Sequence, residues 1–147
     1  MKIGLCSDHR GYKLKESLKV FLQEKGYEIE DFGTNSFERC DHPLYAKNMC
    51  QKIVNDELTY GIAICGTGIG MSIACNKMKG IYCAKVSTVK EAMFSRSHNN
   101  CNVIAISGNM CKFKAKKVVM KFIKTKAIDD SVYEKRRNEI KEIEEND

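Results

Sequence analysis

The sequence predicts an α/β protein with a five-stranded parallel sheet, and three observations point to that fold class. Short apolar runs typical of strands alternate with longer segments whose apolar residues recur at helical spacing. Glycines and polar residues separate these segments as turns do. The chain has 147 residues, 43% of them hydrophobic, which suits a single domain over residues 1–147. Because parallel strands need crossover connections, we expect helices on both faces and three layers, α/β/α.

The amino-terminal part of the chain predicts a strand, a helix and a second strand. Residues 2–6 form a short apolar run, and residues 28–32 form another. Between them, residues 12–25 predict an amphipathic helix with apolar positions at Leu14, Leu18, Phe21 and Leu22. Gly26 follows, in the place where glycine commonly ends a helix.

The middle of the chain is organised around residues 61–70. Residues 61–65 form an isoleucine-rich run that predicts a strand buried on both faces. Glycines at 66, 68 and 70 follow, and residues 71–78 then suit a helix. Upstream, Pro43 suits the first turn of another helix, whose expected buried stripe is Tyr45, Met49 and Ile53.

The second half of the chain continues the alternation. Strands are expected at 81–86 and 103–106, and a lysine-rich helix at 112–124. The sequence from Thr88 to Glu91 predicts a capping box that opens a helix through about Ser97.

A polar helix at about 131–145 follows the completed sheet. Ser131 and Glu134 predict a second capping box at its start. Its few apolar residues are Val132, Ile140 and Ile143. We expect them to pack on a partner chain, which predicts a dimer.

Composition excludes several classes of protein. There is no long apolar run and no signal pattern at the amino terminus, so we expect no membrane contact and a cytoplasmic location. The eight cysteines show no Cys-x-x-Cys or zinc-finger spacing, which predicts reduced thiols and no metal. The net charge of +6 arises largely from lysines at 112–126, a pattern more typical of a solvated helix face than of a nucleic-acid site. The charge also suits small anionic substrates.

Candidate site residues follow two of the predicted strands. Asp8 and His9 follow the first strand, and residues 65–70 follow the third, so the strand-end rule places both at one edge of the sheet. The glycines allow backbone amides to approach a ligand near a helix start. The spacing of Gly66, Gly68 and Gly70 matches neither a dinucleotide fingerprint nor a Walker loop. A tight turn holding a structural cysteine is the simpler alternative, and Asp8 also suits a helix cap.

These residue types suit acid–base chemistry next to a carbonyl. A thiolate abstracts a proton, backbone amides hold the resulting enolate oxygen, and a histidine moves protons on a hydroxyl. Aldose–ketose isomerisation needs this set, and a nucleophilic Cys–His hydrolase uses a similar one. Spacing along the chain does not separate the two.

Five motifs in order resemble the ribose-5-phosphate isomerase B family, within a wider group that includes galactose-6-phosphate isomerase. They are Ser7-Asp8-His9-Arg10-Gly11, Asp31-Phe32-Gly33-Thr34, the stretch from Cys65 to Gly70, Ala74-Cys75-Asn76-Lys77, and the stretch from Ser95 to Val103. The resemblance implies a Rossmann-like α/β/α domain and a homodimer with sites at the subunit interface, which could pair further into a tetramer. It also implies no cofactor, and interconversion of ribose 5-phosphate and ribulose 5-phosphate through an enediolate in the pentose phosphate pathway.

The resemblance also implies roles at matching positions. Cys65 matches the catalytic base and His98 the residue that assists ring opening, whereas on position alone His98 is a histidine facing the end of a helix dipole. Thr67, in the loop that holds the sugar and its developing oxyanion, is the third expected catalytic residue. The remaining residues match contacts to the substrate: Asp8, His9, Asn99, Gly66, Gly68, Ile69 and Gly70.

The chain departs from the family pattern where phosphate is held. Asn109 stands where the family often has an arginine after the fifth strand. In the last helix, Val132 replaces the first arginine of an Arg-His-x-x-Arg pattern, and Arg136 remains in register. We therefore expect Arg136 to bind the substrate phosphate, and Asn109 to contact the substrate without the phosphate grip of an arginine. Two alternatives stay open: an isomerase of a six-carbon sugar phosphate (galactose 6-phosphate or allose 6-phosphate), and a non-catalytic sugar-phosphate sensor.

Overall fold

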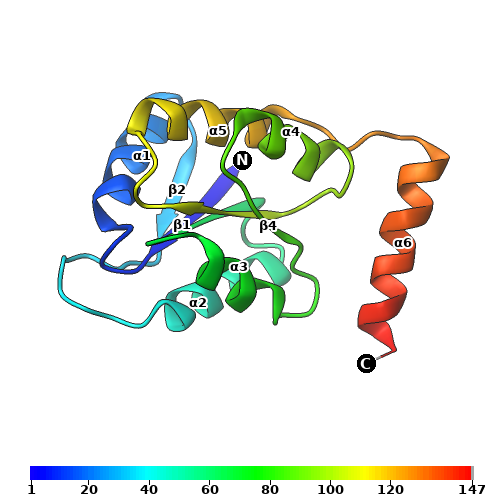
Figure 1. The fold of residues 1–147 in the computed structure, drawn as a ribbon, viewed down its shortest axis with the longest axis horizontal. Coiled ribbons are helices and arrows are strands. Elements are labelled where there is room, and N and C mark those ends of the chain that lie inside the picture. Colours follow the sequence, from blue (N-terminus) through cyan, green and yellow to red (C-terminus); the bar gives the residue numbers. More distant parts are fainter. Residues whose placement is uncertain (147) are drawn as a thin grey trace.

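The computed structural model describes residues 1–146 and confirms the three-layer α/β/α architecture (Figure 1). The strands are β1 (Lys2–Ser7), β2 (Glu28–Asp31), β3 (Tyr60–Cys65), β4 (Cys83–Lys85) and β5 (Val103–Ser107). The helices are α1 (Tyr12–Glu24), α2 (His42–Val54), α3 (Ile69–Asn76), α4 (Val89–Ser97), α5 (Lys112–Lys124) and α6 (Ser131–Glu145). Within the described residues, no helix has the length and apolar character needed to cross a bilayer.

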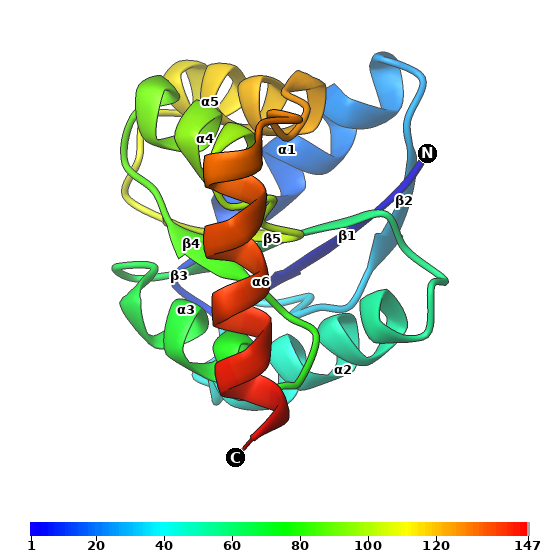
Figure 2. The same cartoon turned by 90° about the vertical axis from the view of Figure 1, so that its right-hand side faces the viewer.

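All strand pairs in the sheet are parallel, in the order β2-β1-β3-β5-β4. In register, Gly61 lies opposite Val103 and Cys65 opposite Ser107. Helices α1, α4 and α5 cover one face, and α2 and α3 cover the other (Figures 1 and 2). Because every strand points the same way, their carboxyl ends meet at one edge of the sheet, which we call the carboxyl edge. The opposite edge is called the amino edge.

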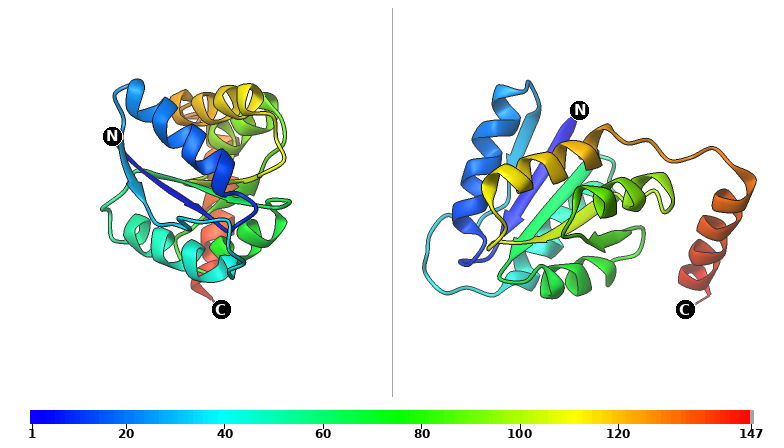
Figure 3. Two further views of the ribbon diagram at one scale, coloured as in Figure 1. Left: turned by 90° about the vertical axis from the view of Figure 1, so that its left-hand side faces the viewer. Right: turned by 45° about the horizontal axis from the view of Figure 1, so that its top comes forward.

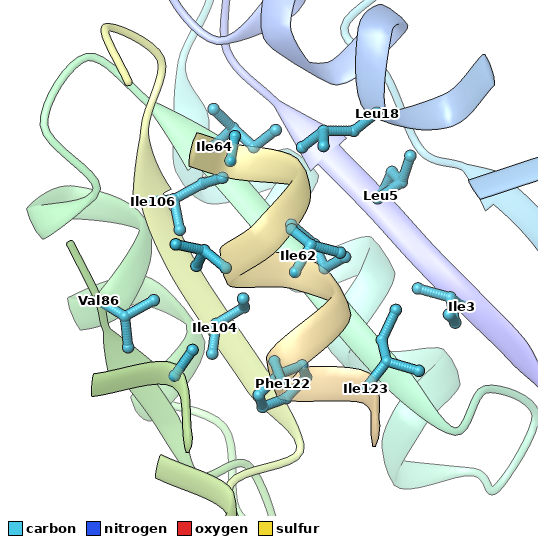
Figure 4. Close-up of a cluster of buried hydrophobic side chains, with 14 of the residues drawn as sticks. Ile3, Leu5, Leu18, Ile62, Ile64, Val86, Ile104, Ile106, Phe122 and Ile123 are labelled. Atoms are coloured by element: carbon cyan, nitrogen blue, oxygen red, sulfur yellow. The ribbon is translucent and has the colours of Figure 1, made fainter. Parts of the chain in front are cut away.

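Alternation along the central strands separates large from small side chains. The isoleucines of β3 and β5 pack with Phe122 of α5 on one face, as Figure 4 shows. Ala63, Cys65 and Ala105 belong to the cluster on the other face, beneath α2 and α3. Successive strand residues point to opposite faces, so the order Ile-Ala-Ile-Cys sends the Cys65 side chain toward α3.

Several element ends differ from the expectation. β4 is only three residues long. The Ile81 amide donates to the Met78 carbonyl, and the Tyr82 amide donates to the Asn102 side chain, so neither amide bonds to a neighbouring strand. The expected capping box at Ser131 is wrong. Asp130 caps α6, since its Oδ1 accepts the Val132 amide hydrogen at 2.9 Å. The capping box at Thr88 is confirmed.

Helix α6 lies apart from the three layers, beyond the amino edge (Figures 1 and 3). Polar contacts tie its far end to the body: Glu144 accepts from the Gly80 amide at 2.8 Å and from the Tyr82 hydroxyl at 3.3 Å. Its apolar residues Val132, Ile140 and Ile143 are exposed in the single chain.

A buried ion pair joins α1 to β2. Lys15 is fully buried within α1, and its Nζ lies 2.6 Å and 2.8 Å from the Asp31 carboxylate oxygens. Asp31 also accepts from Lys19 at 3.0 Å and from the Gly33 amide at 2.9 Å. Burial alone would raise the pKa of the Asp31 carboxyl, but these hydrogen bonds hold the pKa below its ordinary value.

We predict that Asp31→Asn lowers the free energy of unfolding by roughly 3 kcal/mol at pH 7, because it leaves a buried ammonium with a weaker partner. A carboxyl whose folded pKa is depressed contributes stability above its unfolded pKa of about 3.9 and loses it as pH falls through the folded value. The difference between wild type and variant in urea unfolding should therefore narrow below about pH 4.

The matched control is Glu139→Gln, which removes an exposed carboxylate paired with Lys135 on α6. It should change the unfolding free energy little. If Asp31→Asn lowered the free energy of unfolding by the same amount at every pH, the carboxylate charge would contribute nothing, and the substitution would act through packing.

Candidate active site

The glycine turn (residues 66–70) connects β3 to α3 at the carboxyl edge. Cys65 is 5% exposed at the end of β3, and its Sγ accepts the Gly68 amide hydrogen at 3.2 Å. Thr67 is exposed, and its Oγ1 accepts the Ile69 amide hydrogen at 3.1 Å. α3 begins at Ile69, two residues earlier than expected, so the amides of Ile69 and Gly70 belong to the first helical turn. Amides in a first helical turn lack an intrahelical acceptor; that of Ile69 bonds to Thr67 Oγ1, and that of Gly70 is a candidate donor to a ligand.

Glycine at position 68 is required by two features of the backbone. Its φ is +81°, in the left-handed region, and a Cβ would lie 2.9 Å from the carbonyl carbon of Ile106. The turn therefore packs directly on the backbone of β5. This contact holds the Gly68 amide where it reaches the Cys65 sulfur.

The end of β5 ties the glycine turn in place from its other side. The Ser107 hydroxyl donates to the Gly66 carbonyl at 2.7 Å and accepts from the Asn109 amide at 3.1 Å. The Gly108 amide donates to the Cys65 carbonyl at 2.8 Å. Asn109 is exposed beside this tether, so the structure places it at the carboxyl edge.

Asp8 and His9 lie in the turn after β1, at the same edge. One oxygen of the buried Asp8 carboxylate accepts the amides of Arg10 and Gly11, at 2.9 Å and 3.0 Å. It thus caps the turn rather than α1, whose N-cap is Gly11. His9 Nδ1 accepts the Cys40 amide hydrogen at 3.3 Å, so the neutral ring carries its proton on Nε2 and can donate to a ligand.

Two residues at this edge were missing from the predicted site. Arg10 lies over Gly66, with its Cδ 3.0 Å and its Nη1 3.1 Å from where a Gly66 Cβ would be. The His42 imidazole lies against Gly70, with Nε2 2.7 Å from the corresponding position. Arg10 lies in the turn after β1, with Asp8 and His9, so the strand-end rule could have included it. No local signal places His42, which arrives through the long 32–41 connection.

His98 and Asn99 lie at the amino edge, beyond α4. The His98 ring is stacked between Phe94 and Tyr133, with centroid separations of 4.5 Å on each side. Asn99 lines a cavity of about 260 Å³ between α6 and the body, together with Asn100 and Arg137. Arg136 is exposed on α6, with its guanidinium carbon 5.9 Å from the Tyr133 ring centre.

Two arginines fix the segment that carries His98. Arg96 is 7% exposed and donates to the Asn100 side chain and the Cys101 carbonyl, both at 2.7 Å. Arg137 donates to the His98 carbonyl at 3.2 Å and to the Ile128 carbonyl at 3.1 Å. Arg96 therefore sets the loop after α4, and Arg137 attaches α6 to it.

One chain does not bring all the predicted residues together. Cys65 is the last residue of β3. His98 lies in the segment before Val103, which pairs with Gly61 near the start of β3. The six residues of β3 span roughly 17 Å, so the two side chains belong to opposite edges. We name Asp8, His9, Arg10, Cys65 and Thr67 the carboxyl-edge cluster. His98, Asn99, Tyr133, Arg136 and Arg137 form the amino-edge cluster.

The carboxyl-edge cluster suits proton abstraction next to a carbonyl. Cys65 supplies the sulfur, and the neighbouring amides of the glycine turn are donors of the kind that hold an enolate oxygen. Two other cysteines on the same face are poor bases, because their thiols resist ionisation. Burial raises the pKa of the Cys6 thiol, and a hydrogen bond to Cys75 together with burial raises that of Cys50.

Comparison with known proteins shows a match along nearly the whole chain. A model described as Ribose/Galactose Isomerase matches residues 3–140. Ribose-5-phosphate isomerase B of Escherichia coli K12 is 40% identical over 119 residues, which is 81% of this chain and 80% of that protein. The structure of ribose-5-phosphate isomerase B from Clostridium thermocellum matches with a TM-score of 0.96 at 37% identity, covering 99% of both chains. The Mycoplasma genitalium enzyme with bound ribulose 5-phosphate matches with a TM-score of 0.93 at 32% identity, over 99% of this chain and 97% of that one.

We predict that Gly68→Ala lowers the free energy of unfolding by more than Gly26→Ala. Both glycines have positive φ, +81° and +89°, and nothing lies within 4 Å of a Cβ at Gly26. Gly26→Ala should thus cost about 1–2 kcal/mol for the left-handed backbone alone. Gly68→Ala adds the collision with Ile106, so urea unfolding should show a clearly larger loss. Equal losses would mean that the turn moves away from β5 without cost.

Proposed function

Because the chain belongs to the ribose/galactose isomerase family, we propose that it is an aldose–ketose isomerase interconverting ribose 5-phosphate and ribulose 5-phosphate. The observation that carries this proposal is Cys65 at the end of β3, buried beneath the first amides of α3. Relatives named ribose-5-phosphate isomerase B match most of the chain, and one was solved with ribulose 5-phosphate bound. The free thiols of all eight cysteines suit reaction in the cytoplasm.

At the carboxyl edge, Cys65 acts as the base. Its thiolate takes the proton from C2 of the open-chain aldose, and the electrons form an enediolate whose oxygen is held by amides of the glycine turn. The same thiol returns the proton to C1 to give the ketose, while the hydroxyl proton moves between the two oxygens. Thr67 and Asp8 contact the sugar hydroxyls. No metal or organic cofactor enters this scheme.

The site is completed by a second copy of the chain. A cyclic sugar has no carbonyl, so ring opening must precede proton transfer, and His98 is the residue we assign to it. His98 lies too far from Cys65 to act on the same molecule within one chain. A homodimer that sets the amino-edge cluster of one chain over the carboxyl-edge cluster of the other would join them. The exposed Ile140 and Ile143 of α6 supply apolar surface for that contact.

The amino-edge cluster would also bring Arg136 to the substrate, next to Asn109 of the other chain. Arg136 was expected at the phosphate and Asn109 among the substrate contacts, and both residues are exposed. The family description spans ribose and galactose isomerases, so a six-carbon sugar phosphate is the second candidate substrate.

A coupled assay on ribose, allose and galactose phosphates tests the substrate, and ribose 5-phosphate should give the highest kcat/KM. Cys65→Ala and Cys65→Ser should each lower kcat at least ~100-fold, because neither side chain is a base at neutral pH. Substrate affinity, measured by calorimetry, should stay close to wild type.

Cys111→Ser serves as the control for loss of a thiol, because Cys111 is exposed at the start of α5. It should retain full turnover. Turnover by Cys65→Ala at a near-normal rate would rule out the thiol base, and no turnover of any sugar phosphate by the wild type would favour the sensor.

Hybrid dimers test whether two chains share each site. A dimer of one Cys65→Ala chain and one His98→Asn chain, purified through two different tags, should regain about half of the wild-type activity, because one of its two sites is intact. Each variant alone should be inactive on the cyclic substrate.

The matched control is a hybrid of wild type with the double variant Cys65→Ala, His98→Asn. Shared sites leave this hybrid inactive, since each site then carries one substitution. The opposite pattern, an inactive first hybrid and a half-active second one, would place both residues in the site of a single chain.

A further inference from the structure

The Arg10 side chain lies against the glycine turn at the carboxyl edge. It extends from the turn after β1 and lies across Gly66, with Nη1 3.1 Å from where a Gly66 Cβ would be. Gly66 directly follows Cys65, the buried last residue of β3. A guanidinium therefore covers the outer surface of the glycine turn, one residue from the thiol.

The backbone that carries Arg10 is fixed on two sides. The Asp8 carboxylate accepts the Arg10 amide hydrogen at 2.9 Å. The Arg10 carbonyl packs on Gly108, where an added Cβ would lie 2.4 Å from the carbonyl oxygen. The side chain is nevertheless exposed. A charged group on a rigid turn loses less conformational entropy when it binds a ligand than one on a mobile loop does.

The guanidinium has no polar partner in the part of the chain that the structure describes. In residues 1–146, no hydrogen bond or ion pair involves the Arg10 side chain. Arg96 and Arg137, by contrast, donate to backbone carbonyls. Lys13 and Lys112 line a cavity of about 270 Å³ between α1 and the start of α5, across the sheet from the Cys65 side chain. Among the described residues, Arg10 is thus the cation that lies on the glycine turn with its donors free.

We propose that Arg10 binds the phosphate group of the substrate at the carboxyl edge, an inference that rests on the proposed function. In a sugar phosphate, the dianion lies at the opposite end of the carbon chain from the carbonyl. The buried Cys65 receives the carbonyl end, and the exposed guanidinium receives the hydrated phosphate. The planar fork of arginine pairs with two phosphate oxygens at once. His9, adjacent in the turn, offers its Nε2 hydrogen to the same group.

The test compares Arg10→Gln and Arg10→Lys with wild type, using ribose 5-phosphate, unphosphorylated ribose and inorganic phosphate as a competitive inhibitor. Arg10→Gln should raise the KM for ribose 5-phosphate and the inhibition constant of inorganic phosphate about 10- to 100-fold. The kcat should change only a few-fold, and kcat/KM for ribose should not change. Arg10→Lys should recover part of the loss, because it restores the charge without the fork.

Lys124→Gln is the matched control, because it removes one exposed positive charge at the far end of α5. It should leave both constants unchanged, which separates a local contact from an effect of net charge. Equal losses on ribose and ribose 5-phosphate would overturn the proposal, because Arg10 would then support the turn or the reacting carbons. An unchanged inhibition constant for phosphate would overturn it too.

Calorimetry keeps the proposal testable even if the wild type turns over no sugar. Ribose 5-phosphate and inorganic phosphate should then bind the wild type and Lys124→Gln equally, and Arg10→Gln about 10- to 100-fold more weakly. Binding that is equal in all three proteins would refute the role of Arg10 independently of the proposed reaction.

Discussion

The contact between Gly68 and the backbone of Ile106 is the constraint on which the carboxyl edge depends. A residue with a side chain does not fit there, and only a left-handed backbone turns the Gly68 amide toward Cys65. The same contact lies one residue before the start of α3 and so helps to place the amides of its first turn. Ser107 and Gly108 then connect the turn to the end of β5, so that β3, α3 and β5 position the thiol together.

Most of the fold could be predicted from periodicity, because the central strands consist almost entirely of buried residues, most of them apolar. The alternation in β3 and β5 fixes which side chains face α5 and which face α3. Lys15 shows where this reasoning fails: a lysine in a helix is normally exposed, and it takes the distant Asp31, together with the neighbouring Glu16, to make its burial favourable. Local sequence also favoured Ser131 as the cap of α6, whereas the backbone geometry selects Asp130.

The candidate site was predictable only in part, since the strand-end rule applies to one edge of the sheet. It groups Asp8, His9, Cys65 and the glycine turn, and the structure places all of them at the carboxyl edge. It offers nothing for His98, which was assigned through family resemblance and lies at the other edge. Arg10 was missed although it shares the turn after β1 with Asp8 and His9. His42 was missed because its position depends on a distant glycine, Gly70, that leaves room for its ring.

The attachment of α6 has a consequence for the order in which the protein forms. The sheet and its five covering helices share two continuous apolar clusters, whereas α6 contributes no buried residue. Its few hydrogen bonds and the stack of Tyr133 on His98 hold it in the single chain. Amide hydrogens of α6 should thus exchange with solvent far sooner than those of β3, and the helix should become protected only when a second chain covers it. In the proposed dimer, the reaction centre would then be completed late in assembly and would depend on protein concentration.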